Sequence, residues 1–446
     1  MMNREVPETI LCPNGHENAP ENLECSECGL PLIDWEEAVS SLLGRLAEKA
    51  GFIVPHIGGS FIGVGTAGGE IVTNLGNFFG EDMPGVSFLT VDSMAGSGAE
   101  TGGRLTATGI RFYQHAIGDT AIGGNIYCGL GERAASQDDQ LESYLHMSGI
   151  RSEDSSQAVF VTAAGGGGTG SGVGPAMIHL CRLCNQDVST VALFILPSSS
   201  EADHSHLNAF YGVSRVLVAG GQPNADMALL LNYDKLRRIR GVGRSGKEFK
   251  ADELVSYLLW LFHLDLHNSG IIRMCRLSKG SKIQVFVPCV AIGRSIEIFG
   301  NLGNILESAA AYPLAEIDFS SIMSSYLLVR IPRAIAHDFP DEVITEEFEA
   351  WNSKHIPNVS STLVQVLHTD ERSDRIDVCI LLGGADVGEI LKSTISGYRR
   401  FKSSLRGSAQ WEEYGLSEGA INEAEQVIAG YDELMEELRQ SKSEEG

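Results

Sequence analysis

The chain has 446 residues, which is too long for one compact core, so we expect two or three domains. Lys and Arg number 33 against 58 Asp and Glu, and the resulting net charge of −25 disfavours binding to nucleic acid and to anionic membranes. No apolar run is long enough to span a bilayer and no basic-then-apolar leader opens the chain, which predicts a cytoplasmic protein without direct membrane insertion.

A short N-terminal segment gathers three of the nine cysteines. Cys12 precedes His16 by four positions, and Cys25 and Cys28 form a CxxC pair. In a segment too short for its own core, these two pairs favour four ligands to a structural zinc ion over exposed thiols beside a surface histidine. We therefore predict a zinc ribbon over residues 1–33, followed by an amphipathic helix over residues 34–50.

The glycine-rich segment 164–172 is the most informative feature of the chain. It holds six glycines in nine residues and lies between an apolar strand at 158–162 and a helix that we expect to start at Pro175. Glycines let backbone N–H groups approach a ligand closely, and a helix N-terminus favours negative charge. With hydroxyl donors from Thr169 and Ser171, the segment predicts a phosphate cradle rather than a flexible linker.

A second glycine-rich turn follows the apolar strand at 61–64. Gly63, Gly65 and Gly68 have the spacing of the dinucleotide-binding fingerprint, and Asp92 ends the next strand, so an NAD-dependent enzyme is one alternative. Such an enzyme needs only one glycine loop, whereas two phosphate-facing loops on one sheet suit a nucleoside triphosphate better.

Strands alternate with helices through the first half of the chain, which predicts a parallel, doubly wound sheet. A strongly apolar helix at 250–267 should be buried between domains. Beyond Gly270 the pattern indicates a second sheet, whose last two strands would form a hairpin. A polar helix at 419–440 should pack against the body, with a coiled coil as the alternative. The strands expected in the second sheet cover residues 283–292, 326–331, 362–367 and 377–382.

Residues 166–172 read GGGTGSG, and further motifs follow in the order found in one family. On these residues the chain resembles the tubulin/FtsZ family, and its first glycine loop resembles that of the archaeal CetZ branch. The resemblance implies an α/β fold with a doubly wound parallel-sheet GTPase domain, a long core helix and a second α+β domain with a small sheet. We place a zinc ribbon at 1–33, a linking helix at 34–56, a GTP-binding domain at 57–247, the core helix at 248–269, the second domain at 270–405 and a C-terminal helix at 416–440.

The resemblance also implies that GTP or GDP binds with Mg²⁺ at the carboxyl ends of the parallel strands. Glu201 would bind the ribose, and Asn232 would open the base site. Phe249 would stack on guanine, while Asp252 or Glu253 would accept from its N1 and N2 donors. The other implied nucleotide contacts are Gly65, Thr66, Ala67, Gly68, Gly69, Glu70, Asp92, Ser93, Gly131, Gly166, Gly167, Gly168, Thr169, Gly170 and Ser171.

The sequence departs from the family where hydrolysis is concerned. Family members hydrolyse GTP after subunits stack head-to-tail and an acidic loop of the next subunit polarises water. Aligning the long helix puts residues 272–278 at that loop, and they include no carboxylate. A shifted alignment offers Asp265, which we expect at the surface of a helix end. The catalytic residue therefore stays unassigned and GTPase activity stays open, and Arg273 and Arg276 are hypothesised to bind the neighbour's phosphate instead.

Two functions are consistent with these motifs. The first is a nucleotide-dependent filament or scaffold in cell division, shape or positioning. The second is a non-polymerising GTP-binding adaptor whose zinc ribbon or C-terminal helix docks a protein partner. A second CxxC pair, Cys181 and Cys184, follows the glycine-rich segment, and we interpret both cysteines as helix residues, with metal binding as the alternative.

Overall fold

The computed structural model describes residues 10–11, 17–18, 59–83, 85–93, 110–117, 127–147, 150, 158–239, 249–266, 268–369 and 373–445. The chain divides into two compact units, Met1–His56 and Ile57–Gly446. In the first unit, β1 (Ile10–Leu11) pairs antiparallel with β2 (Glu17–Asn18). The predicted zinc ligands Cys12, His16, Cys25 and Cys28, and the predicted helix at 34–50, lie outside the described residues.

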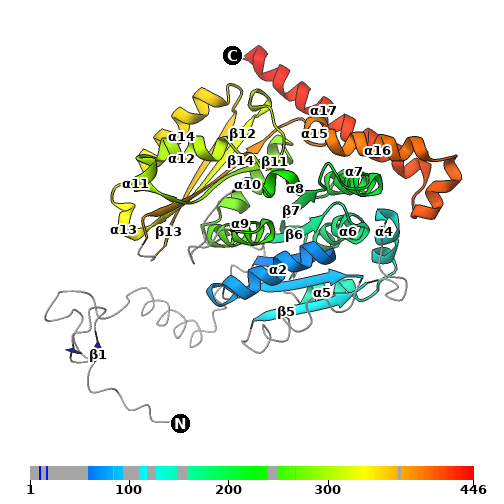
Figure 1. Ribbon diagram of the computed structural model, residues 1–446, viewed down its shortest axis with the longest axis horizontal. Helices are drawn as coiled ribbons and strands as arrows, with labels where there is room; N and C mark the ends of the chain where they lie inside the picture. Colours follow the sequence, from blue (N-terminus) through cyan, green and yellow to red (C-terminus); the bar gives the residue numbers. More distant parts are fainter. Residues whose placement is uncertain are drawn as a thin grey trace, which may run out of the picture. The chain divides into compact units, whose positions relative to one another are not determined.

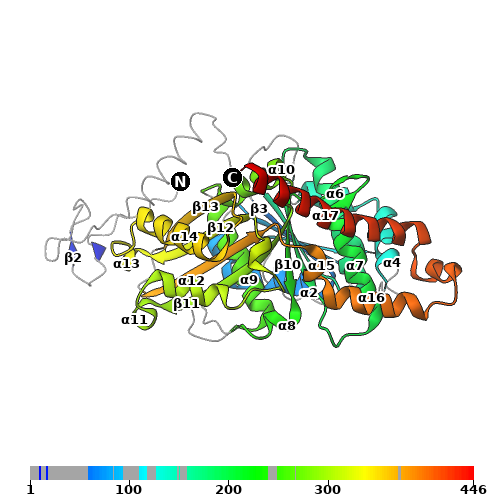
Figure 2. The same ribbon diagram turned by 90° about the horizontal axis from the view of Figure 1, so that it is seen from above.

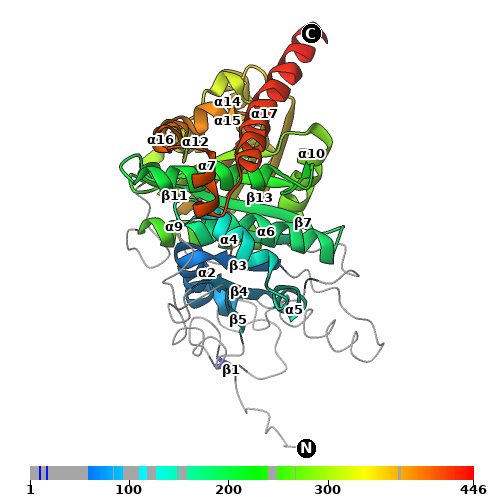
Figure 3. The same cartoon turned by 90° about the vertical axis from the view of Figure 1, so that its right-hand side faces the viewer.

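The second unit is built on one ten-stranded sheet with the order β13-β12-β14-β11-β10-β7-β6-β3-β4-β5. Figure 3 shows β5, β4 and β3 following one another upward, with β7 above them. The run from β5 to β11 is parallel throughout, as the alternation of strands and helices predicts. The strands are β3 (Gly59–Val64), β4 (Ser87–Asp92), β5 (Arg111–Ala116), β6 (Ala158–Ala164), β7 (Ser189–Leu196), β10 (Met227–Asn232), β11 (Val285–Ser295), β12 (Ser324–Pro332), β13 (Ser361–Thr369) and β14 (Arg375–Gly383), while β8 (Val218–Ala219) and β9 (Gln222–Pro223) form a separate small ribbon.

The prediction of a separate second sheet is wrong, because β11 to β14 extend the parallel sheet beyond β10. The predicted hairpin is also wrong, since β12 lies between β13 and β14. The burial of the two strands explains this order. The side chains of β14 are buried along almost its whole length, which suits a strand with neighbours on both sides, whereas β13 is half-exposed and forms the edge.

Helices connect and cover these strands (Figure 1). Helix α2 packs on β3, β4 and β6, and α6 packs against α4, α5 and α7. The described α-helices are α2 (Gly65–Phe79), α4 (Cys128–Ser136), α5 (Leu141–Met147), α6 (Gly168–Cys184), α7 (Asp203–Leu217), α8 (Tyr233–Leu236), α9 (Ala251–Leu266), α10 (Gly270–Ser281), α11 (Ile296–Phe299), α12 (Leu302–Ala310), α13 (Arg333–Ala336), α14 (Asp341–His355), α15 (Val387–Ile390), α16 (Lys392–Ser404) and α17 (Glu418–Glu445), with 3₁₀ turns at Gly80–Asp82, Phe319–Ser321 and Ser408–Tyr414. None of the described helices is both long and apolar enough to cross a bilayer.

Helix α9 is the predicted core helix, and nearly all of its apolar residues are buried, on every side of the helix. Two of its side-chain hydroxyl groups form hydrogen bonds with different parts of the sheet and its helices. The Ser256 hydroxyl donates to the carbonyl of Ile71 on α2 at 2.8 Å, and the Tyr257 hydroxyl donates to Asp377 on β14 at 2.6 Å. The helix therefore joins the half of the sheet that carries α2 to the half added by β11 to β14.

Helix α17 packs against the body, as its helical spacing of apolar residues predicts. Figure 2 shows it running beside α7 and α16. The Tyr431 hydroxyl accepts from the backbone N–H groups of Gln284 and Val285 at 3.1 and 2.9 Å. The Asp432 carboxylate accepts from the N–H groups of Val387 and Gly388 at 2.7 and 2.9 Å and so caps α15.

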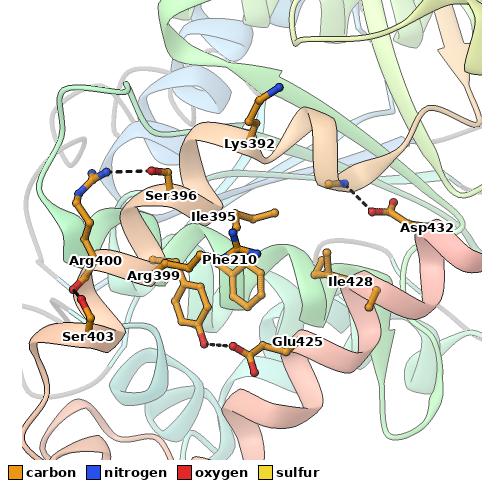
Figure 4. Close-up of a pocket in the computed structure, with 13 residues that line it drawn as sticks. Phe210, Lys392, Ile395, Ser396, Arg399, Arg400, Ser403, Glu425, Ile428 and Asp432 are labelled. Carbon is orange, nitrogen blue, oxygen red and sulfur yellow. Dashed lines mark hydrogen bonds between the residues drawn. The ribbon is translucent and has the colours of Figure 1, made fainter.

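A cavity of about 910 Å³ lies between α16 and α17, over α7. Figure 4 shows side chains that line it, among them Phe210 of α7 and Glu425 of α17. Tyr398 also lines the cavity, and its hydroxyl donates to Glu425 at 2.7 Å. The ring of Phe210 on α7 stacks on Tyr398 with centroids 4.2 Å apart. Arg400 on α16 also pairs with Asp203, the first residue of α7, at 2.8 Å. These contacts fix α16 on the helix that follows the loop of Glu201.

Candidate functional site

Two helix N-termini meet at the carboxyl ends of β3 and β6. Helix α2 begins at Gly65 directly after β3, and α6 begins at Gly168, with three residues between it and the end of β6. Gly65 has a φ of +71°, and a Cβ built on it would lie 3.2 Å from the backbone nitrogen of Gly170. The unpaired N–H groups and the positive dipole ends of both helices therefore lie side by side, which makes this junction suited to an anion.

Helix α6 starts earlier than predicted, at Gly168 instead of Pro175. The physical reason is close packing rather than helix propensity. A Cβ on Gly170 would overlap the carbonyl of Ala164, and one on Gly172 would overlap the backbone of α4. Gly167 differs, because a Cβ there would meet no atom within 4 Å. The open side of the junction is therefore at Gly167.

The first loop also contains both a glycine needed for close packing and a glycine with more open surroundings. A Cβ on Gly68 would overlap the carbonyl of Thr162 on β6, so Gly68 allows α2 to pack closely on the sheet. Gly69 is half-buried, and the closest atoms to a Cβ built on it would be those of Thr90 at 3.9 Å. Ala67 and Glu70 are exposed on α2.

A chain of side-chain hydrogen bonds links three of the loops. Thr66 donates to one carboxylate oxygen of Asp92 at 2.9 Å, and the backbone N–H of Ser93 donates to the other at 2.7 Å. The Thr169 hydroxyl then donates to the Ser93 hydroxyl at 3.1 Å. The ends of β3, β4 and β6 are thereby held together, and the predicted residues Thr66, Asp92, Ser93 and Thr169 form one cluster.

Ser171 does not fit the predicted role of phosphate donor. Its side chain is fully buried, its hydroxyl donates to the carbonyl of Gly165 at 2.6 Å, and its backbone N–H donates to the carbonyl of Gly167 at 3.1 Å. Both of its donors are therefore used inside the protein. They hold the shape of the loop before α6. The N–H of Gly165 donates to the carbonyl of Ile195 at 2.7 Å, so the N–H groups suited to an anion are those of residues 166–169.

Asn208 is a site residue that the sequence did not predict. Its side-chain oxygen accepts from the N–H of Cys128 at 2.8 Å, and its amide nitrogen donates to the carbonyl of Gly166 at 3.0 Å. It thus ties the start of α4 to the glycine loop. On α4, a Cβ on the predicted residue Gly131 would overlap Gly168, so Gly131 serves the contact of α4 with α6. The sequence signal that could have indicated Asn208 was an asparagine on the buried face of α7.

Glu201, the predicted ribose ligand, lies beside the glycine loop. One carboxylate oxygen accepts from the N–H of Ser198 at 2.8 Å, and a Cβ on Gly166 would lie 2.7 Å from the other. The loop of Glu201 is held by Asp234, which accepts from the Ser198 hydroxyl at 2.7 Å and from the N–H of Ser199 at 2.9 Å. These hydrogen bonds lower the pKa of Asp234.

The predicted base-site residues come from two helix starts. The side-chain oxygen of Asn232 accepts from the N–H groups of Asp234 and Lys235 at 2.9 and 3.3 Å and so caps α8. Phe249 and Asp252 are half-buried at the start of α9, and the ring of Phe249 lies against Tyr257 with centroids 5.0 Å apart. The structure brings Asn232 to the loop of Glu201 through Asp234.

Asp265 is fully buried, so its predicted surface position is wrong. Its carboxylate accepts a hydrogen bond from the Tyr326 hydroxyl of β12 and lies at the first residue of α10, where a Cβ on Gly270 would overlap it. Burial raises the pKa of this carboxyl to about 6. Residues 272–278 lie on α10, with Arg273 and Arg276 exposed.

Residues 60–241 match the GTPase domain of the tubulin/FtsZ family. A curated relative, the cell division protein FtsZ of Porphyromonas gingivalis, is 29% identical over 201 residues, which cover 44% of this chain and only 38% of the relative's own length.

Solved structures of similar fold include CetZ2 from Haloferax volcanii, described as a GTPγS-bound protofilament. It is 19% identical, with a TM-score of 0.59 over 78% of this chain and 99% of that one. CetZ from Methanosaeta thermophila is 18% identical, with a TM-score of 0.57 over 84% of this chain and 99% of that one. At these identities the likeness shows a shared fold.

Proposed function

We propose that this chain is a tubulin/FtsZ-like GTP-binding protein that forms nucleotide-dependent filaments or scaffolds in cell division, shape or positioning. The observation that carries the proposal is the junction of α2 and α6, where two helix N-termini lie together and Gly167 faces open space. The matching GTPase-domain family and the protofilament described for CetZ2 support the same function.

The residues at the junction fit a guanine nucleotide. The N–H groups of Gly166, Gly167, Gly168 and Thr169 would bind its phosphates, and Glu201 would accept from its ribose hydroxyls. Asn232, Phe249 and Asp252 would hold the base. A bound Mg²⁺ would neutralise phosphate charge, and the exposed carboxylate of Glu70 lies on the phosphate-facing helix α2.

Hydrolysis by this chain should be slow. The carboxylate nearest the end of α9 belongs to Asp265, which is buried, and residues 272–278 place two arginines on α10. A group that activates water on a neighbouring subunit has to be exposed. The same observation favours the second candidate, a GTP-binding adaptor that does not polymerise.

Sedimentation of the zinc-loaded protein with GTP, GDP or no nucleotide separates these functions when phosphate release is followed in the same tubes. We expect GTP-dependent pelleting with little phosphate release. Pelleting with rapid turnover would overturn the slow-hydrolysis proposal. No pelleting while GTP is still bound would favour the adaptor.

The substitution Gly167→Ala tests the phosphate site directly. Its Cβ meets no protein atom, and the backbone at Gly167 is in the β region that alanine adopts readily, so the fold should be unaffected. The Cβ would occupy the space proposed for phosphate, and we expect GTP affinity to fall by about tenfold or more. Gly430→Ala, on α17 with equally open surroundings, is the matched control. Equal GTP affinity in both variants would contradict this placement of the phosphates.

A structural zinc ion at the N-terminus is part of the proposal. Leu11 lies opposite Glu17 in the pairing of β1 with β2, and Cys12 and His16 are the sequence neighbours of these two residues. This pairing supports a metal site with Cys25 and Cys28 as the other ligands. We propose this ribbon, or α17, as the docking element for a protein partner.

A further inference from the structure

Three side chains with metal-ligating atoms converge where α5 packs against α6. One ligand atom each from Glu142, His146 and Cys184 lies within 4.8 Å of the other two. Glu142 and His146 are one helical turn apart on α5, and His146 Nε2 lies 3.6 Å from Glu142 Oε1. Cys184 is the last residue of α6, so two helices from different parts of the sequence contribute to the cluster.

We propose that Glu142, His146 and Cys184 bind a zinc ion, with the fourth coordination position open to water. In a tetrahedral zinc site with metal–ligand distances of about 2.0–2.3 Å, neighbouring ligand atoms lie about 3.5 Å apart. The Glu142–His146 distance already has this value, and the remaining atoms reach it by side-chain rotation, because Glu142 and His146 are exposed.

The chemistry of the three ligands selects the metal. A thiolate beside an imidazole and a carboxylate suits zinc, whereas Mg²⁺ prefers oxygen ligands alone. The position suits a cation as well, because Cys184 is at the C-terminal end of the 17-residue helix α6, where the helix dipole is negative. The site is therefore distinct from the phosphate-facing N-terminus of the same helix and from the predicted N-terminal ribbon.

Of the second CxxC pair, only Cys184 belongs to this cluster. Cys181 is fully buried within α6, one turn earlier. The spacing of the two cysteines therefore does not define the site. The neighbouring helix α5 does, by presenting Glu142 and His146 to the end of α6.

The test uses the full chain with Cys12→Ser, Cys25→Ser and Cys28→Ser, which removes the thiolates of the predicted ribbon. Titration with Co²⁺ as a spectroscopic probe should saturate at one equivalent with a thiolate-to-cobalt charge-transfer band. Adding Cys184→Ser should abolish the band, and adding His146→Gln should weaken binding by about tenfold or more. Cys181→Ser and His179→Gln, both on α6 and outside the cluster, are the matched controls and should retain the band.

A charge-transfer band that survives Cys184→Ser, or the absence of any band in the folded triple-serine protein, would overturn the proposal. If the triple-serine protein does not fold, the zinc content of the unsubstituted chain decides instead. The Cys184→Ser variant should then hold one zinc ion fewer per chain than the unsubstituted protein, and equal zinc content in both would overturn the proposal.

Discussion

Asp265 is a fully buried carboxyl group at the end of α9. The Tyr326 hydroxyl donates to it, Arg273 lies nearby, and burial raises its pKa to about 6. Because the folded protein holds this proton more tightly than the unfolded chain does, the stability contributed by Asp265 falls as pH rises from about 4 through about 6. The carboxyl group of Asp265 therefore links α9, α10 and β12 where they meet.

The substitution Asp265→Asn should remove this dependence. Relative to the unsubstituted protein, the free energy of unfolding of the variant should rise by about 1–2 kcal/mol from pH 5 to pH 8, because asparagine cannot ionise. Denaturant unfolding at both pH values measures the difference. Asp187→Asn, at an exposed position, is the control, and its stability relative to the unsubstituted protein should be the same at both pH values. A constant difference for Asp265→Asn would contradict the raised pKa.

At the scale of elements, α17 is held by polar groups as much as by its apolar face. Tyr431 accepts from two backbone N–H groups before and within β11, and Asp432 caps α15. Arg439 extends this attachment by pairing with Asp386 at 2.6 Å. The C-terminal helix is therefore part of the folded body, next to the start of β11.

Tyr431→Phe tests this attachment. The variant keeps the ring but leaves the N–H groups of Gln284 and Val285 without their acceptor, which should cost about 1–3 kcal/mol of unfolding free energy. Tyr312→Phe is the control, because Tyr312 is 55% exposed. Chemical denaturation followed by circular dichroism measures both, and equal stabilities would show that the hydroxyl of Tyr431 contributes nothing.

At the scale of the whole molecule, a net charge of −25 opposes the proposed self-association. Like-charged subunits repel each other over distances set by the Debye length, which salt shortens. Filaments of this chain should therefore assemble more readily at higher ionic strength, unless specific ion pairs dominate the interface.

We expect the GTP-dependent pelleted fraction to rise as KCl increases from about 0.05 M to about 0.3 M. Sedimentation at constant protein and GTP concentration measures it, and equimolar GDP in parallel tubes controls for salting-out. A pelleted fraction that falls with salt would indicate that attractive charge pairs, such as Arg273 and Arg276 on a neighbour, hold the subunits together.

The sequence by itself determined the local elements. Apolar runs between glycine turns located β3, β4, β6, β7 and β10, and the apolar pattern at 250–267 located α9, because burial and periodicity are properties of contiguous residues. The two glycine loops were also predicted from the sequence, since close backbone approach and helix starts depend on residue type at fixed spacing, and Glu201 was implied by the resemblance to the tubulin/FtsZ family.

Only the tertiary structure decided which distant residues meet. Strand order in the second half of the sheet, the burial of Asp265 and the link from Asn208 to the glycine loop all depend on partners far along the chain. The start of α6 also depends on distant partners. Glycine has low helix propensity, but packing against α4 and β6 makes Gly168 the first residue of the helix. Glu142, His146 and Cys184 likewise become a cluster only when α5 packs on α6, since side-chain proximity across elements is set by packing and not by sequence spacing.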